Sequence, residues 1–352
     1  MTARVRPQAA EEQLEAARVS PALAIGVLLA ALGAALLAAV GFGAVSVPPA
    51  DVLAAIGRAL SGVAGPVSDN VILGIRLPRA VLAALVGASL ATAGVIYQAL
   101  FRNPLADPFI LGVSSGAGLG AMAVIVGTAG VTGLRYFGVP AGAFIGALLT
   151  VVLVVRLASM RGRLEVTSLL LAGIAISYTL SAVTSFMMVF AKESMATIVF
   201  WMMGGLSGAS WQYVITLALM LAVGLALPLS RTRAMNVMLL GDARATQLGV
   251  DVERFKLMML SAASLLTAGA VAVSGLIGFV GLMTPHAVRL VVGPDHRVLV
   301  PASALAGAIV MVAADLLARV VLAPVEIPVG VVTAIAGGPF FVWLLVRGMR
   351  AR

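Results

Sequence analysis

Residues 78–100 of the chain read PRAVLAALVGASLATAGVIYQAL, an apolar run in which Arg79 is the only charged residue. A helix needs about 20 apolar residues to cross the hydrocarbon core of a bilayer. A run of this length, rich in Ala, Gly and Leu, predicts a transmembrane helix rather than a strand. The whole chain of 352 residues has the same character, being 61% hydrophobic and 11% charged with a mean hydropathy of +1.12. This composition excludes most water-soluble folds and predicts an all-α polytopic membrane protein.

Ten apolar runs of this kind follow one another along the chain. We expect transmembrane helices at about 21–45, 78–100, 109–130, 137–157, 167–190, 211–230, 256–273, 276–293, 300–320 and 328–347. The seventh and eighth runs are the hardest to separate, because only a turn near Gly275 lies between them. Segment 48–62 is expected to form a short surface helix. Segment 195–207 is apolar but too short to cross, which predicts a re-entrant or interfacial position.

The basic residues are distributed unevenly between the two sides of these predicted spans. Seventeen of the 23 fall on one side, and the other side has Arg58, Arg76, Arg79, Arg135, Lys192 and Arg319. Because basic loops are retained in the cytoplasm, the richer side and both termini are predicted to be cytoplasmic. The predicted organisation is a cytoplasmic tail at 1–20, a transmembrane domain at 21–347 with a cytoplasmic loop at 231–256, and a second cytoplasmic tail at 348–352. This placement accounts for the net charge of +9 without a nucleic-acid partner.

Two segments near the middle of each half resemble each other. Residues 94–106 (GVIYQALFRNPLA) and 275–287 (GLIGFVGLMTPHA) share Gly, Ile, Pro and Ala at an offset of 181. With five spans per half, a repeat would make the two halves inverted in the membrane, a common plan among transporters. Chance similarity between apolar sequences is the alternative.

Several kinds of chemistry are absent from the sequence. The chain has no cysteine, and the spacing of His286 and His296 fits no helical metal site, so we expect no metal ligands. It has no Walker A phosphate loop and therefore no nucleotide site of that kind. The G-x-S-x-G pattern at 112–116 opens a predicted span without an acid or histidine nearby, which argues against a hydrolase.

Ionisable residues are also missing from the middle of the predicted spans, since Asp315 and Glu326 lie near the outer end of the ninth. Ion-coupled carriers usually need buried acids or histidines. The chain is therefore predicted to be a conduit driven by a partner and not an enzyme. A secondary carrier that uses only carbonyl and hydroxyl ligands is the alternative.

Polar groups concentrate in two places. On the outer side, Arg76 and Arg79 flank Pro78, and Arg319 ends the ninth span, which predicts a docking patch for an acidic partner. The alternative is interfacial snorkelling, with Arg319 paired to Asp315. On the inner side, loop 231–256 has the pattern of two short amphipathic helices broken at Gly241. Such helices could dock a soluble protein, the alternative being a plain solvated loop.

Three further strings carry a family resemblance that covers nearly the whole chain after the first span. They are RNPLADP at 102–108, TPHAVR at 284–289 and GPDHR at 293–297. In series they make the chain similar to the ABC-importer permeases for vitamin B12, haem and ferric siderophores. The resemblance implies a homodimer of ten-helix subunits around a central path in the bacterial inner membrane. It further implies two cytoplasmic ATPase subunits, which hold ATP and Mg²⁺, and a periplasmic or lipid-anchored substrate-binding protein, with no cofactor bound by this chain.

The resemblance also implies residue roles. Arg76, Arg79 and Arg319 match the arginines that receive glutamates of the binding protein. Gly241, Asp242, Ala243 and Arg244 match the turn of the coupling helices that sit in the ATPase, and Asn103 and Leu105 match the cytoplasmic gate.

Other assignments stay open from the sequence. Met187, Met188, Met202 and Met203 either line the path or pack as ordinary apolar residues. His286 and Arg289 are expected to be structural. The expected substrate is haem or a ferric siderophore, with cobalamin as the alternative.

Overall fold

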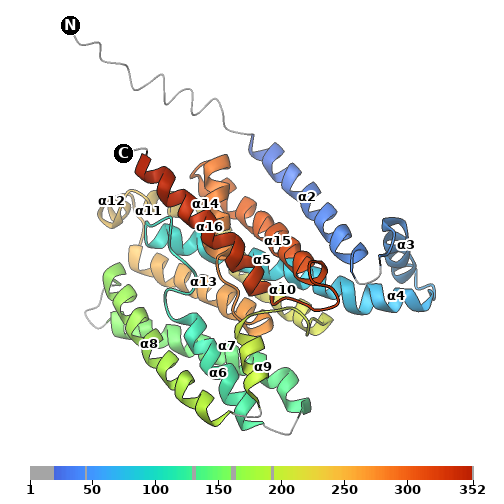
Figure 1. The fold of residues 1–352 in the computed structure, drawn as a ribbon. Helices are drawn as coiled ribbons and strands as arrows, with labels where there is room; N and C mark the ends of the chain where they lie inside the picture. Colours follow the sequence, from blue (N-terminus) through green and yellow to red (C-terminus); the bar gives the residue numbers. More distant parts are fainter. Residues whose placement is uncertain (1–19, 44–45, 129–131, 160–163, 192–193, 351–352) are drawn as a thin grey trace.

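The computed structural model describes residues 20–43, 46–128, 132–159, 164–191 and 194–350, and every regular element within these residues is a helix. Figure 1 shows their arrangement. The helices are α2 (Pro21–Gly41), α3 (Pro49–Leu60), α4 (Val67–Val71), the π-helical segment η1 (Ile72–Arg76), α5 (Leu77–Leu100), α6 (Val113–Gly127), α7 (Thr132–Ala158), α8 (Val166–Phe190), α9 (Met195–Met202), α10 (Trp211–Ser230), α11 (Thr232–Met238), α12 (Asp242–Gln247), α13 (Val252–Ser274), α14 (Val280–Val292), α15 (His296–Val320) and α16 (Val329–Arg350).

Seven helices in the described part of the chain are long and apolar enough to cross a membrane. They are Pro21–Gly41, Val67–Leu100, Tyr136–Ala158, Val166–Phe190, Trp211–Ser230, Val252–Ser274 and His296–Val320. Three shorter apolar helices cover Val113–Gly127, Val280–Val292 and Val329–Trp343. Each of the ten predicted runs overlaps one of these helices, and the all-helical class with several apolar, membrane-length helices is confirmed.

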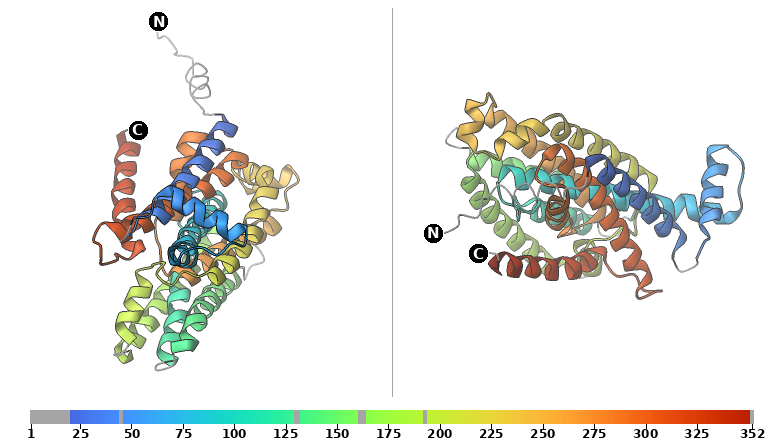
Figure 2. Two further views of the ribbon diagram at one scale, coloured as in Figure 1. Left: turned by 90° about the vertical axis from the view of Figure 1, so that its right-hand side faces the viewer. Right: turned by 90° about the horizontal axis from the view of Figure 1, so that it is seen from above.

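Helix α5 occupies the centre of the molecule. It packs against α15, α13, α14 and α10, and nearly all of its residues from Val86 to Leu100 are buried. Figure 2 shows it surrounded by the other helices. Small residues allow this close packing, because Gly87 faces the backbone of Gly307 in α15 and Gly94 faces that of Gly281 in α14.

The helix that contains α5 begins earlier than the sequence predicted, at Val67 instead of residue 78. Its 34 residues span about 51 Å, more than the roughly 30 Å of a hydrocarbon core, so its first turns project past the length that a crossing requires. The π-helical segment η1 lies just before Pro78. Proline has no N–H to donate, and its ring crowds the backbone carbonyl four residues earlier in the chain. There the Leu77 N–H bonds to the carbonyl of Ile72, five residues back. The projecting turns pack beside α3, and Arg58 and Asp69 join the two at 2.8 Å.

Two other predictions concern short elements. The surface helix expected at 48–62 is α3, and the apolar segment at 195–207 holds α9 followed by a bend at Gly204, whose φ is +70°. The eighth span was expected from residue 276, but α14 begins at Val280, after an irregular turn in which Gly275 and Phe279 have φ values of +68°.

The two resembling segments do not adopt the same local structure. Residues 94–100 end α5 and 101–106 are loop, whereas 275–279 are irregular and 280–287 begin α14. Their similarity therefore does not mark equivalent positions of a structural repeat.

Candidate functional site

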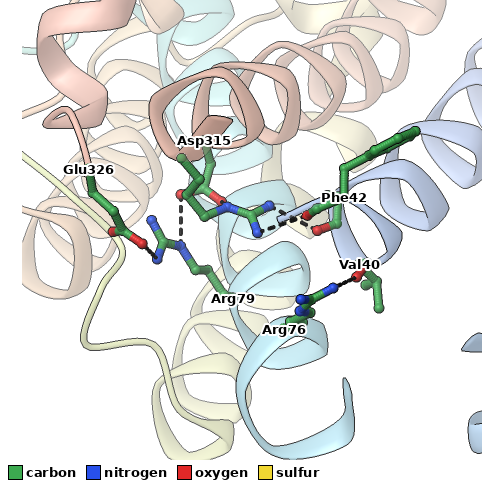
Figure 3. Close-up of polar contacts among 8 residues, drawn as sticks. Val40, Phe42, Arg76, Arg79, Asp315 and Glu326 are labelled. Atoms are coloured by element: carbon green, nitrogen blue, oxygen red, sulfur yellow. Dashed lines mark hydrogen bonds and ion pairs between the residues drawn. The ribbon is translucent and has the colours of Figure 1, made fainter. Parts of the chain in front are cut away.

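The three predicted outer arginines lie together around the end of α2 (Figure 3). Arg76 comes from the end of η1 and donates to the carbonyls of Val40 at 3.0 Å and Gly41 at 3.3 Å. Arg319 comes from α15 and donates to the carbonyls of Ala39 at 2.9 Å and Phe42 at 3.4 Å. The last carbonyls of a helix lack partners within it and carry the negative end of its dipole, so two cations stabilise this helix end.

The carboxylate of Asp315 joins the other members of this outer arginine cluster. Its Oδ1 lies 3.0 Å from Arg79 Nε and its Oδ2 lies 3.1 Å from Arg319 Nε. Asp315 is 1% exposed, and the side chains of Arg79 and Arg319 are 12% and 9% exposed. Arg79 also pairs with Glu326 at 3.0 Å. The pairing of Arg319 with Asp315, raised as an alternative above, is therefore present.

The cluster is thus more fully paired than a free docking patch would be. Arg79 and Arg319 pair with the carboxylates of Asp315 and Glu326, while Arg76 binds backbone carbonyls, so the three arginines and two carboxylates leave a formal charge of +1. Glu326 is the most exposed member at 46%, and a cavity of about 470 Å³ adjoins it and Arg79. No local pattern predicts the pairing of Arg79 with Asp315, because 236 residues separate them.

At the opposite end of the molecule, the inner loop has the predicted form. Helices α11 and α12 are separated by Gly241, whose φ of +100° favours glycine. Met235, Met238 and Ala245 are buried against the core, while an exposed apolar face is formed by three leucines that are 42%, 53% and 62% exposed: Leu239, Leu240 and Leu248. Ala243 and Arg244 of the predicted coupling turn are also exposed.

One tether fixes α11 to the start of α15. The Asn236 amide donates to Asp295 at 2.7 Å, and its oxygen accepts from the backbone N–H of His296 at 3.0 Å and lies 2.7 Å from the ring Nδ1. Asp295 caps α15 by accepting from the Arg297 N–H at 3.0 Å. This backbone bond, followed by the Asn236 bond, holds the pKa of Asp295 below its ordinary value. His296 therefore takes part in the tether through both its backbone N–H and its ring.

A second tether fixes the start of α12. Asp242 pairs with Arg102, in the loop after α5, at 3.0 Å and with Lys256, near the start of α13, at 2.6 Å. Lys256 also donates to the carbonyl of Leu164 at 2.9 Å. Of the residues predicted at the coupling turn, Asp242 is thus the one that binds other elements.

The predicted gate residues lie beside this tether. Asn103 follows Arg102 directly and its side-chain oxygen accepts from the Leu105 N–H at 3.0 Å, forming a tight turn. Both side chains are exposed. The end of α5 is held nearby, because Gln98 donates to the Leu282 carbonyl and accepts from Arg289 at 3.0 Å. This contact agrees with the structural role expected of Arg289.

The four predicted path methionines do not form one surface. Met187, Met188 and Met202 pack against a buried apolar cluster around α9, as ordinary packing residues do. Met188 and Met202 also border a cavity of about 170 Å³ that is rich in hydroxyl groups of α6 and α8, including Ser115 and Ser181. Met203 follows the last residue of α9 as its C-cap. Within the described residues there is no cluster of His, Asp or Glu able to hold a metal ion.

Comparisons with known proteins place this arrangement in a family. Residues 23–347 match the FecCD transport family. The chain is 49% identical over 281 residues to the cobalamin import system permease protein BtuC of Halobacterium salinarum, covering 80% of this chain and 74% of that protein. It is 42% identical to the hemin transport system permease protein HmuU of Yersinia pestis, covering 80% and 84%. It is 39% identical to the Fe(3+) dicitrate transport system permease protein FecD of Escherichia coli, covering 93% and 98%.

The fold agrees with these relatives. A solved inward-facing structure of a metal-chelate type ABC transporter superposes with a TM-score of 0.81 at 31% identity, covering 92% of this chain and 98% of that one. A second structure, PsaBC from Streptococcus pneumoniae in complex with Fab, has a TM-score of 0.54 at 17% identity and shares the fold. The extent of these matches leads to one conclusion: the chain belongs to the FecCD transport family.

Proposed function

We propose that this chain is the membrane-spanning permease subunit of an ATP-driven importer for a bulky metal chelate. The observation that carries the proposal is the inner segment α11, Gly241 and α12. It presents three exposed leucines and Arg244 to solvent while Asn236 and Asp242 tie it to the membrane helices. An exposed apolar face with a charged rim suits a protein partner. We assign that partner as a pair of cytoplasmic ATPase subunits, which supply the ATP and Mg²⁺ that this chain does not bind.

The proposed assembly is a homodimer of ten-span subunits. Helix α5 fills the centre of the protomer, so a path wide enough for a chelate has to run along an edge of it. A second copy placed on that edge would close the path on its open side. The order of spans supports two inverted five-helix halves, because α5 and α13, the second span of each half, are the two most buried and run in opposite directions. Their antiparallel course follows from the tether that brings the end of α5 to the start of α13.

The proposed location is the bacterial inner membrane with both termini in the cytoplasm. The distribution of basic residues supports this orientation, since 17 of the 23 lie on the side predicted to be cytoplasmic. Under this orientation the outer arginine cluster faces a substrate-binding protein. The cluster keeps a net positive charge, and Glu326, which pairs with Arg79, is exposed. A carboxylate of the binding protein would compete with Glu326 for Arg79.

Haem or a ferric siderophore is the proposed substrate, supported by the hemin and ferric dicitrate relatives. Cobalamin is the second candidate, and it is favoured by the 49% identity to a cobalamin permease. The hydroxyl groups along α6 and α8 offer weak, distributed contacts suited to a conduit that must release its cargo. The Met188 and Met202 side chains at that cavity are proposed to line the same route.

The proposal is tested by reconstituting the permease with its partner ATPase and binding protein in lipid vesicles. Uptake of haem, a ferric siderophore and cobalamin is measured with ATP, without ATP, and with an ion gradient alone. Uptake that requires ATP supports the importer, and uptake that follows the ion gradient without the ATPase would establish a secondary carrier instead. Replacing Leu239 and Leu240 with Asp is expected to prevent ATPase assembly, while Leu322→Asp, an exposed leucine near the outer end, is the matched control.

A further inference from the structure

We propose that Asp242 is a positioning residue that links the coupling segment to the gate loop through Arg102 and to the membrane helices through Lys256. The inference rests on the proposed function, since it concerns how motion of α12 reaches the path. It assigns roles to Arg102, the first residue of the RNPLADP string, and to Lys256, the last residue of the loop 231–256, for which the sequence predicted no individual role.

The first arm of the linkage is the ion pair with Arg102. Arg102 has a φ of +48°, a left-handed conformation that non-glycine residues rarely adopt. The conformation directs its guanidinium over Gly241, where an added Cβ would lie 3.0 Å from Nη1. The absence of a side chain at Gly241 therefore leaves room for the 3.0 Å contact between Arg102 Nη2 and Asp242 Oδ1. Because Asn103 follows directly and forms its turn with Leu105, a displacement of Arg102 moves the predicted gate loop.

The second arm is the ion pair with Lys256. The Lys256 side chain is 6% exposed, and its ammonium bonds to Asp242 Oδ2 at 2.6 Å and to the Leu164 carbonyl at 2.9 Å. The Leu164 N–H in turn bonds to Glu253 at 2.9 Å. A buried ammonium requires a counter-charge, so the carboxylate of Asp242 is held firmly from this side. The second arm thus reaches both the start of α13 and the segment before α8.

The two arms use different oxygens of one carboxylate, and each arm belongs to a different element. A displacement of α12 must therefore move the end of α5 and the start of α13 with it, or break an ion pair. Another ion pair of this loop, Arg254 with Asp251, is local and exposed, with side chains 84% and 56% accessible, and connects no distant elements. Arg254 therefore provides a control that matches Arg102 in charge and lies in the first turn of α13, close in sequence to Lys256.

The test measures ATP hydrolysis and chelate uptake together in vesicles that hold the complete complex. Arg102→Ala is expected to leave assembly and ATP hydrolysis nearly unchanged while lowering the chelate moved per ATP by about tenfold, a typical size for coupling between sites. Arg102→Lys keeps the charge and should restore part of the ratio, and Arg254→Ala should leave it at the wild-type value. Asp242→Asn, which affects both arms, should lower the ratio further than Arg102→Ala.

The outcomes separate the linkage from the proposed function. If the wild-type complex moves no chelate with ATP, the proposed function fails. If the wild-type complex is active but Arg102→Ala keeps the wild-type ratio, the linkage is overturned. The linkage is also overturned if Arg102→Ala loses ATP hydrolysis and uptake in equal measure or fails to assemble, because Arg102 would then act on the ATPase or the fold and not on transmission.

Discussion

Arg79 and Asp315 form an ion pair at 3.0 Å between α5 and α15, although 236 residues separate them. Asp315 is almost fully buried and also faces Arg319. A buried carboxylate between two guanidinium groups fixes the relative position of the two helices that carry them, because each arginine depends on the same counter-charge.

Replacing Asp315 by Asn should therefore destabilise the protein strongly. Removing one member of a buried pair leaves the other charge uncompensated, which costs about 3 kcal/mol. Thermal unfolding in detergent measures the effect. Glu326→Gln is the control, because Glu326 pairs with the same Arg79 but is 46% exposed, and its removal should cost under about 1 kcal/mol. Equal losses in the two variants would contradict this account of the cluster.

The outer arginine cluster should also govern docking of the binding protein. Arg76→Glu together with Arg79→Glu is expected to weaken docking by about tenfold or more at low salt, with a smaller effect at high salt, because charge complementarity acts chiefly on association. Binding is measured on immobilised permease in nanodiscs. Arg58→Glu reverses an arginine on the same side that pairs with Asp69, away from the cluster, and should leave docking unchanged. Docking that is insensitive to both salt and the double variant would rule out the cluster as the receptor.

Close helix packing predicts a different pattern for glycine variants. A Cβ on Gly94 would overlap the carbonyl oxygen of Gly281, whereas a Cβ on Gly33 of α2 meets open space. Gly94→Ala should cost about 1–3 kcal/mol through overpacking. Gly33→Ala should be neutral or slightly stabilising, because alanine is the better helix former. Unfolding of the two variants side by side in one detergent checks the contrast, which equal stabilities would contradict.

The cap of α15 predicts a pH dependence. Because the folded pKa of Asp295 is lowered, its contribution to stability is present above its ordinary pKa of about 4 and is lost as the pH falls through the lower folded value. Asp295→Ala should cost about 1 kcal/mol at pH 7, as is usual for a lost helix cap. That difference from the wild type should shrink below about pH 4. Asp295→Asn keeps a capping oxygen without a titrating group, so its stability relative to Asp295→Ala should not vary with pH.

Long apolar runs were sufficient to predict the membrane helices, and local patterns predicted α3 and the break at Gly241. Boundaries at polar positions were not predictable in the same way. The helix that starts at Val67 includes Asp69 and Arg76. Their charges lower the local hydropathy, so the apolar run did not reveal that the helix begins before residue 78.

The tertiary ion pairs were beyond the reach of the sequence for another reason. The pairing of Asp315 with Arg319, one helical turn apart, has a local signature, as has that of Asp251 with Arg254. The contacts of Arg79 with Asp315 and of Arg102 with Asp242 depend on which helices pack together. Apolar periodicity does not specify that arrangement when almost every residue of a helix is apolar.

The uninterrupted helix from Val67 to Leu100 carries Arg76 and Arg79 at its outer end, and Arg102 follows directly after its inner end. Two binding events that act on one stiff rod share a single interaction free energy. If a partner bound at the outer end changes the binding affinity at the inner end by some factor, a partner bound at the inner end must change the affinity at the outer end by the same factor. Measuring either affinity with the other partner present and absent should therefore yield the same factor.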